Sequence, residues 1–273
     1  MRKQTNKLSN LCIYILLLCI LSSCYEGSDG CQDIRAVNYD LTADEPCDDE
    51  PCCTYPVIEF RPDYAWDTLN FNLNTLYPLS GGDSIIVRYA HQVLSQIDII
   101  SNTGNSYRSI DTADFTRDNM YDLADIILLN FRAGNARSTP HIIIRDSISS
   151  IQFLQDIPSE INDFQNDFTD FSEIEELVED SLYDVNGDIL SFSMEFDLIN
   201  TDTISYIVSV SAQNFTKELL FKSVQSIENG ENFVVDLLVD LNKLFKDVIF
   251  DDIDSITLRE HLIVNLEDYI ELK

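Results

Sequence analysis

Regular alternation of apolar and polar side chains is the feature that most constrains the fold of this chain, and it is clearest over residues 85–100. The apolar positions of this stretch are Ile85, Val87, Tyr89, Val93, Ile97 and Ile99. The polar positions that oppose them are Arg88, Gln92, Gln96 and Asp98. Because successive side chains of a β-strand point to opposite faces of a sheet, the pattern predicts a half-buried antiparallel strand with one bend.

Shorter stretches with the same period of two recur from residue 57 onward. They cover residues 68–74, 122–131, 141–145, 149–155, 189–198, 203–211, 217–226 and 231–241. Turn-forming sequences such as Ser80-Gly-Gly-Asp83 and Asn102-Thr-Gly-Asn105 separate them. About nine short strands without regular intervening helices predict an all-β fold, an antiparallel β-sandwich.

Two segments have helical spacing instead. Ser172-Glu-Ile-Glu175 fits a capping box, and apolar residues continue from it at helical intervals to Leu182, which predicts a short inserted helix. At the end of the chain, residues 258–270 place five apolar side chains on one face and predict a C-terminal helix packed on the sandwich. These side chains are Leu258, Leu262, Leu266, Tyr269 and Ile270.

The first 24 residues combine a basic start, an apolar run and a cysteine. Arg2, Lys3 and Lys7 precede the apolar residues 11–21, a run too short to span a bilayer. Leu21-Ser-Ser-Cys24 then matches the lipobox, in which two small residues precede an obligatory cysteine. We therefore expect residues 1–23 to be a signal peptide that is removed, and Cys24 to carry diacylglycerol and a further acyl chain such as palmitate. This lipid would anchor an exported lipoprotein to a membrane.

The predicted mature chain is strongly acidic. Removing the signal peptide takes three basic residues from a chain of formal net charge -31, which leaves -34. Such a charge repels phosphates, which argues against nucleic acid as a partner and against docking on anionic lipid headgroups. With 45% hydrophobic residues the chain is nevertheless expected to be globular, and a solvated surface is the favoured interpretation of its acidity.

Four further cysteines lie close behind the predicted anchor, and none follows them. They are Cys31, Cys47, Cys52 and Cys53. In an exported protein this clustering predicts two disulfides that hold a segment too short for its own apolar core. A bond between the adjacent Cys52 and Cys53 would strain the peptide, so Cys31 is expected to pair with one of them and Cys47 with the other. Zinc is disfavoured, because the CxxC spacing is absent and no histidine lies nearby in the sequence.

The same segment carries a recognisable pattern that begins at Gly30-Cys-Gln-Asp33, continues through Asn38-Tyr-Asp40 and ends at Cys52-Cys-Thr-Tyr55. It resembles the short cysteine modules of secreted and lipid-anchored bacterial surface proteins. Five of its residues have oxygen atoms suited to calcium, although turn formation and solvated charge are the favoured interpretation. The calcium candidates are Asp33, Asn38, Asp40, Asp48 and Asp49.

A second resemblance covers residues 57–273. Its clearest parts are Phe71-Asn-Leu-Asn-Thr-Leu-Tyr77, Gly82-Asp-Ser-Ile-Ile-Val87 and Val93-Leu-Ser-Gln-Ile-Asp-Ile99. Further matches are Ser150-Ile-Gln-Phe153, Ile157-Pro-Ser-Glu-Ile-Asn162, Leu219-Leu-Phe221 and Asn242-Lys-Leu-Phe245. Their order resembles the MbnP-like (methanobactin-periplasmic-protein-like) family of copper-associated exported proteins and lipoproteins. The resemblance implies a β-sandwich that binds copper, or a compound carrying it, through histidines and an oxidised tryptophan.

This sequence lacks the family's ligand residues at the positions that match them. Residues 182–188 contain no tryptophan, residues 206–211 contain no histidine, and the single tryptophan, Trp66, is expected to pack or to line a surface. Three histidines remain as copper candidates, and packing or solvation is the favoured interpretation of each. They are His91, His141 and His261. No Gly-x-Ser-x-Gly or phosphate-loop pattern occurs, and we do not expect an enzyme.

These observations divide the chain into three parts. We expect residues 1–23 to be the signal peptide, residues 24–55 to be the lipid anchor and disulfide-rich module, and residues 57–273 to be a β-sandwich that resembles the MbnP-like family. We expect a lipoprotein of the cell envelope with a binding, non-catalytic domain. The alternative is a surface interaction module that binds a protein or a glycan and has no metal site. Tyr25 and Glu26 lack the Asp that would favour the inner membrane, which favours the outer membrane, with the domain periplasmic or surface-exposed.

Overall fold

The structure is a computed structural model that divides the chain into two compact units, Met1–Thr54 and Tyr55–Lys273. The described residues are 27–47, 52–108, 112–113, 122–123, 127–131, 137–138, 142, 144, 147–156, 190–210, 216–226, 230–251 and 253–273. The short inserted helix predicted at 172–182 lies outside these residues. Within them, no helix is long and apolar enough to cross a bilayer.

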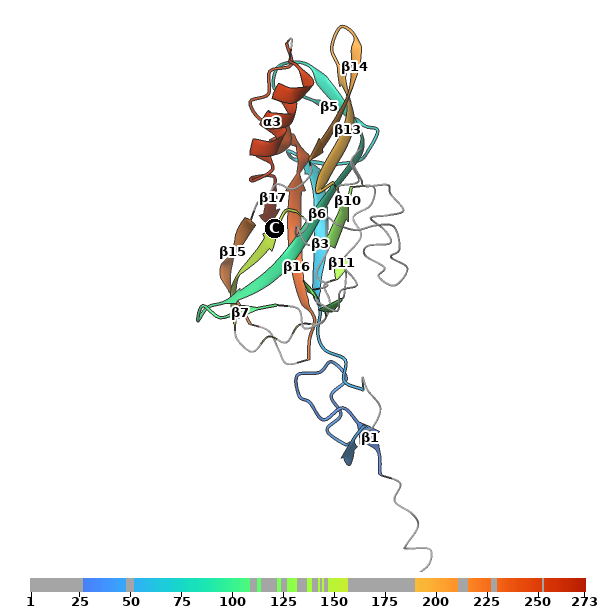
Figure 1. The fold of residues 1–273 in the computed structure, drawn as a ribbon, viewed down its shortest axis with the longest axis vertical. Coiled ribbons are helices and arrows are strands. Elements are labelled where there is room, and N and C mark those ends of the chain that lie inside the picture. The colour runs from blue at the N-terminus through green and yellow to red at the C-terminus, as the bar shows by residue number, and fades with distance from the viewer. Residues whose placement is uncertain are drawn as a thin grey trace, which may run out of the picture. The chain divides into compact units, whose positions relative to one another are not determined.

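Strands dominate the fold (Figure 1), and the first unit contains two of them, β1 (Asp29–Gly30) and β2 (Glu45–Pro46), which pair in parallel. The longer strands of the second unit are β3 (Ile58–Trp66), β6 (Ser84–Ser101), β12 (Ile148–Leu154), β13 (Phe192–Ile199), β14 (Thr203–Val210), β15 (Thr216–Gln225) and β16 (Phe233–Asp240). Its short strands are β4 (Leu69–Asn70), β5 (Leu76–Pro78), β7 (Ser106–Tyr107), β8 (Thr112–Ala113), β9 (Asp122–Leu123), β10 (Ile127–Asn130), β11 (Arg137–Ser138) and β17 (Ile270–Leu272). A 3₁₀ helix, η2 (Leu241–Phe245), and an α-helix, α3 (Ser255–Asn265), complete the described elements.

The larger sheet has eight strands and is antiparallel throughout. Its order is β14-β13-β6-β12-β15, and β5, β7 and β10 also pair with β6. The 18-residue β6 is therefore the spine of this sheet, as Figure 1 shows. The strand predicted over residues 85–100 is confirmed, and it is long enough to pair with five other strands.

Two irregularities in β6 change which side chains face the core. The register with β13 shifts where Glu195 opposes Tyr89 and Phe196 opposes Val87. The register with β12 shifts again near Gln96, a residue with φ of 49°. Each extra residue in a bulge reverses the alternation beyond it. The core positions of β6 are consequently Ile85, Val87, Ala90, Leu94, Ile97 and Ile99.

The predicted faces of this strand are therefore partly wrong. Val93 is buried but points away from the core, because its neighbour Leu94 points into it, and Tyr89 is only half-buried. Gln92, predicted on the solvent face, is completely buried on the same side as Ala90 and Leu94. The prediction assumed one bend and one unbroken alternation, whereas two bulges re-phase the strand.

The smaller sheet has five strands in the order β11-β3-β16-β17, with β4 paired to β3. The β3–β16 pair is parallel and joins residues 175 positions apart, from Ile58 opposite Phe233 to Ala65 opposite Asp240. The alternation had not singled out β3, because Pro62 and charged neighbours interrupt its apolar positions. Its inward residues are buried all the same.

The core lies between the two sheets and confirms the sandwich. Trp66 of β3 stacks on Tyr77 of β5, with ring centroids 4.9 Å apart. Phe196 of β13 meets Phe245 of η2 edge to face at 5.2 Å. Aromatic pairs of this kind add about 0.5–1.5 kcal/mol each to the burial of their area. The sheets are thus joined by contacts between side chains that come from both.

The C-terminal helix is shorter than predicted. Asp254 caps α3 by accepting hydrogen bonds from the backbone N–H groups of Ile256 and Thr257, and the helix ends at Asn265 rather than at residue 270. Tyr269 and Ile270, predicted on the helix face, lie beyond the end of the helix instead. Tyr269 is in the bend before β17, and Ile270 is the first residue of β17, which pairs with β16. Both are completely buried, so pairing with the sheet overrides a helical spacing that would otherwise continue.

Candidate functional site

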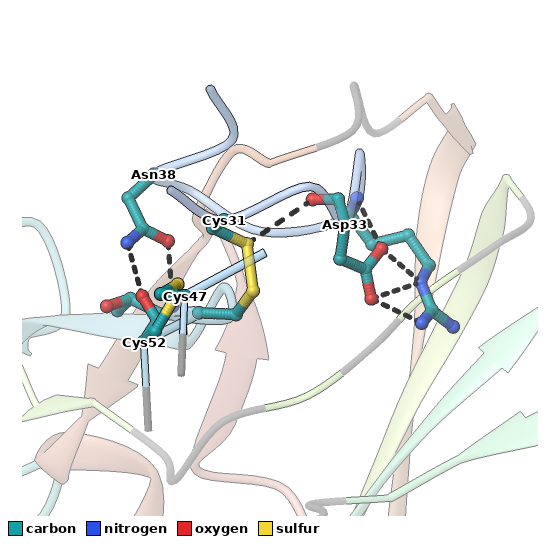
Figure 2. Close-up of a disulfide and its surroundings, with 8 residues drawn as sticks. Cys31, Asp33, Asn38, Cys47 and Cys52 are labelled. Atoms are coloured by element: carbon teal, nitrogen blue, oxygen red, sulfur yellow. Dashed lines mark hydrogen bonds and ion pairs between the residues drawn. A yellow bond between two sulfur atoms is a disulfide. The ribbon is translucent and has the colours of Figure 1, made fainter. Parts of the chain in front are cut away.

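The cysteine module of the first unit contains two disulfides, Cys31–Cys53 and Cys47–Cys52. Their Cα atoms are 5.1 and 6.0 Å apart, within the range that the bond requires. Of the two pairings that the sequence leaves open, the structure has this one (Figure 2). All four cysteines are paired within the module.

The polar residues of the module hold its turns together. Asp33 accepts hydrogen bonds from the backbone N–H of Arg35 and from its guanidinium, with which it forms an ion pair. Asn38 joins two segments, because its amide nitrogen donates to Cys52 O at 2.7 Å and its amide oxygen accepts from Thr54 N at 2.8 Å. Figure 2 shows these contacts around the disulfides.

Asp40, the third described calcium candidate, stabilises a tight turn. Its carboxylate accepts from the hydroxyl and from the backbone N–H of Thr42, which lowers the pKa of Asp40. Asp48 and Asp49 lie outside the described residues. Among the residues that are described, no three His, Cys, Asp or Glu side chains gather as metal ligands would.

Two small residues of the module pattern also have structural reasons. A Cβ atom on Gly30 would lie 2.8 Å from the Cβ of Ala43, a distance that real Cβ atoms do not show. Ala36 is 2% exposed, so a larger side chain has no room there either. The pattern that identified this segment in the sequence is therefore largely the pattern of its packing.

The histidine candidates have different surroundings. His91 on β6 is completely buried, its Nε2 lies 3.3 Å from the carbonyl oxygen of Leu190, and its Nδ1 has no hydrogen-bond partner. Burial lowers the pKa of His91 to about 4, so its ring is neutral at physiological pH. His261 is exposed on α3, and His141 lies outside the described residues.

A buried polar chain crosses the core of the sandwich, and sequence reasoning missed it. The hydroxyl of Tyr269 donates to the amide oxygen of Gln92 at 3.1 Å, and both side chains are completely inaccessible. The Gln92 amide nitrogen donates to the carbonyl oxygens of Val93 and Ser191, each at 2.9 Å. Burial raises the pKa of Tyr269 well above its usual value, so the hydroxyl keeps its proton. The only signal in the sequence was a glutamine within a β-rich apolar run.

Two carboxylates of the larger sheet are held in ion pairs. Arg88 contacts Asp197 at 2.7 Å, and Ser205 donates to the same carboxylate at 2.6 Å. The Ser205 hydroxyl and then the Arg88 guanidinium lower the pKa of Asp197. On β6, Asp98 is paired with Arg108. These groups fasten neighbouring strands to one another.

Trp66 packs in the core and has no exposed edge that would make it a ligand. It is 2% exposed, and its indole N–H donates to the carbonyl oxygen of Pro78 at 3.2 Å. Together with the stacking on Tyr77, this contact commits both the ring face and its one polar atom to the sandwich.

A hollow of about 410 Å³ opens between the β5–β6 turn and the segment after η2. We call it the acidic hollow, because every charged residue among those that line it is a carboxylate: Asp83, Asp247 and Asp251. Its apolar wall includes Phe245 and Phe250, whose ring centroids are 6.3 Å apart. A cation with an apolar stem matches this combination of charge and wall.

Comparisons with known proteins give a single distant likeness to report. No protein-family model and no curated protein matches the chain. Among solved structures, MbnP from Methylosinus trichosporium is similar at 12% sequence identity, over 71% of this chain and 78% of that one, with a TM-score of 0.46. The similarity is structural and distant.

Proposed function

We propose that this chain is an exported lipoprotein whose β-sandwich acts by binding rather than by catalysis. Cys24 would carry the lipid, the cysteine module would separate the lipid from the sandwich, and the sandwich would present a surface to a partner. The outer membrane is the proposed location, with the sandwich periplasmic or exposed at the cell surface.

The observation that carries the proposal is the pairing of the four module cysteines with one another. The chain has seven cysteines, of which Cys12 and Cys19 lie in the predicted signal peptide. Once Cys31–Cys53 and Cys47–Cys52 are formed, Cys24 is the one mature cysteine without a disulfide partner in the chain. It stands at the lipobox position, where acylation requires a thiol. Disulfides also persist in the oxidising compartments that export reaches.

The buried polar groups of the described sandwich argue against their acting as catalytic groups. Asp98, Asp197 and Gln92 form contacts that join strands, and the neutral ring of His91 is enclosed. Groups committed in this way stabilise the scaffold, whereas catalytic acids and bases need access to a substrate. Copper is not part of the proposal, because residues 182–188 and 206–211 lack the aromatic and imidazole side chains of the family pattern.

Labelling of growing bacteria with an alkyne analogue of palmitate tests the anchor. We expect the full chain to be labelled and to enter the detergent phase on partitioning, and we expect Cys24→Ala to abolish the labelling. Cys19→Ala is the matched control, because it removes a cysteine five residues earlier, within the apolar run, and should leave labelling unchanged. Labelling that survives Cys24→Ala would contradict the proposal.

A further inference from the structure

The outer strands of the two sheets differ in how they are protected against pairing with other chains. β11 has two residues and β17 has three, which is too short to template a partner strand. β15 carries Lys217 and Lys222 and loses register with β12 opposite Ser149. Short length, lysines and bulges are the devices by which proteins block the edges of their sheets.

β14 has none of these devices. Its eight residues include no charged residue, no proline and no glycine, and it pairs with β13 without a register shift from Phe192 opposite Val210 to Ile199 opposite Thr203. Among the described strands it pairs with β13 alone. Ile207 is 72% exposed and Ile204 is 44% exposed, so this edge is open to solvent (Figure 1).

The hydrogen bonds at the end of β14 reveal which backbone groups face outward. The carbonyl oxygen of Val210 accepts from Ser191 Oγ, on the side of β13. The neighbouring carbonyl oxygen of Ser209 accepts from Arg259 Nε of α3, on the opposite side. Because successive residues of a strand direct their N–H and C=O groups to alternate sides, the odd-numbered residues face the open edge. Within the part of the chain that the structure describes, the backbone N–H and C=O groups of Thr203, Ser205 and Ile207 therefore face outward in a row with no strand beside them.

We propose that β14 is a docking edge that receives an extended segment of a partner protein as an additional strand, and that the acidic hollow receives a lysine or arginine side chain of that segment. The added strand would exchange backbone hydrogen bonds with Ser205 and Ile207, and its inward side chains would extend the apolar layer beyond Ile204. The proposal does not depend on the lipid anchor.

The hollow adjoins this edge through one aromatic contact. Phe250 lines the hollow, and its ring centroid lies 6.5 Å from that of Tyr206 in the middle of β14. A strand beside Tyr206 thus runs past the wall of a hollow whose charged lining consists of three carboxylates. A partner segment with a basic residue fits this charge, whereas a second copy of a chain of net charge -31 would add to the repulsion.

A phage-displayed library of random ten-residue peptides tests the proposal on the purified full chain. Ile207→Pro removes an outward N–H without removing a bond to β13, and proline is tolerated in edge strands. We expect peptides selected on the wild type to alternate apolar and polar residues, to contain a lysine or arginine, and to bind Ile207→Pro at least about tenfold more weakly. Ile207→Thr, which keeps the N–H and the β-branched shape, should bind them almost as well as the wild type.

Two further measurements test the open edge of β14 and the acidic hollow separately. In amide hydrogen exchange, Ser205 and Ile207 should exchange rapidly in the free protein and become protected when a selected peptide is added. The double variant Asp247→Asn/Asp251→Asn should reduce the preference for basic peptides, while Asp29→Asn/Glu45→Gln, with the same charge change in the other unit, should not.

Three outcomes would overturn the proposal, in its edge, its hollow or its occupant. Peptides that enrich equally on Ile207→Pro would show that the open edge is not the site. Selected peptides without a basic residue would remove the hollow from it. Protection of Ser205 and Ile207 that rises with protein concentration, without any peptide, would identify a second copy of the chain as the occupant instead of a partner. Circular dichroism and Trp66 fluorescence establish that each variant is folded.

Discussion

Replacing Tyr269 by phenylalanine would remove one buried hydroxyl and leave the shape of the side chain almost unchanged. The hydroxyl donates to Gln92 at 3.1 Å, and neither side chain has any access to water. Without it the amide oxygen of Gln92 stays buried with its donor gone. An unsatisfied buried acceptor costs about 1–3 kcal/mol, so we expect Tyr269→Phe to lower the free energy of unfolding by that amount.

A double-mutant cycle isolates this hydrogen bond from the loss of either side chain. Gln92→Met keeps the length of the side chain without its polar atoms, and it leaves the Tyr269 hydroxyl without its acceptor. Once both changes are combined, neither partner of this hydrogen bond is left unsatisfied, so the double variant should lose less stability than the two single losses together. A coupling energy of about 1 kcal/mol or more is expected for groups in direct contact.

Urea unfolding measures these free energies, and the single tryptophan provides the signal. Trp66 is buried and stacked on Tyr77, so its fluorescence reports the integrity of the core. A loss below about 0.3 kcal/mol for Tyr269→Phe, or a coupling energy within that error, would refute the reasoning. In that case the hydrogen bond between Tyr269 and Gln92 contributes nothing measurable to the stability of the core.

Two further predictions concern His91 and Gly30. Because burial lowers the pKa of His91 to about 4 from 6.5, the unfolded chain takes up the proton first, and stability should fall by up to about 3 kcal/mol as the pH drops from 6.5 to 4. The difference between wild type and His91→Gln in urea unfolding across this range measures that loss, and parallel pH profiles would contradict it. Gly30→Ala should loosen the module, because its Cβ would meet that of Ala43, and should speed reduction of the disulfides by dithiothreitol as followed by alkylation and mass spectrometry. Gly81→Ala, with nothing within 4 Å of the added Cβ, is the control; equal reduction rates for the two variants would count against the packing argument.

The sandwich was predictable because alternation survives in most of its strands. Stretches such as 203–211 and 231–241 carry the signal locally, and the structure has strands at Thr203–Val210 and Phe233–Asp240. A period of two in the sequence does not show where a bulge shifts the alternation by one residue. The bulge near Arg88 and the positive φ of Gln96 each depend on the partner strand, so the burial of Gln92 could not be read from β6 alone.

The helix predicted at the end of the chain is too long for a related reason. Leu258 and Leu262 fix the helical face correctly, but Tyr269 and Ile270 continue the same spacing although Tyr269 lies in a bend and Ile270 begins a strand. Only the presence of β16, whose edge β17 completes, decides between the two structures.

The disulfides of the cysteine module were predicted only in part. The clustering of the cysteines predicted two disulfides, and strain excluded one of the three possible pairings. Choosing between the other two pairings requires the path of the chain. The calcium candidates were chosen because their side chains carry oxygen atoms. Contacts of Asp33 with Arg35, and of Asp40 with Thr42, involve residues only two positions away, and they are the kind of turn interaction that the sequence already favoured.

The parallel pairing of β3 with β16 has a consequence for how the chain can fold. A chain that emerges from a ribosome or a membrane pore releases Ile58–Trp66 first and Phe233–Asp240 almost last. Until then β3 lacks the neighbour with which it forms most of its bonds in the smaller sheet, and closing so long a loop slows the search for that neighbour. The smaller sheet therefore cannot form its central pair of strands until the last part of the sequence has been made. During that interval the unfinished sandwich is the species that a chaperone or a protease would meet.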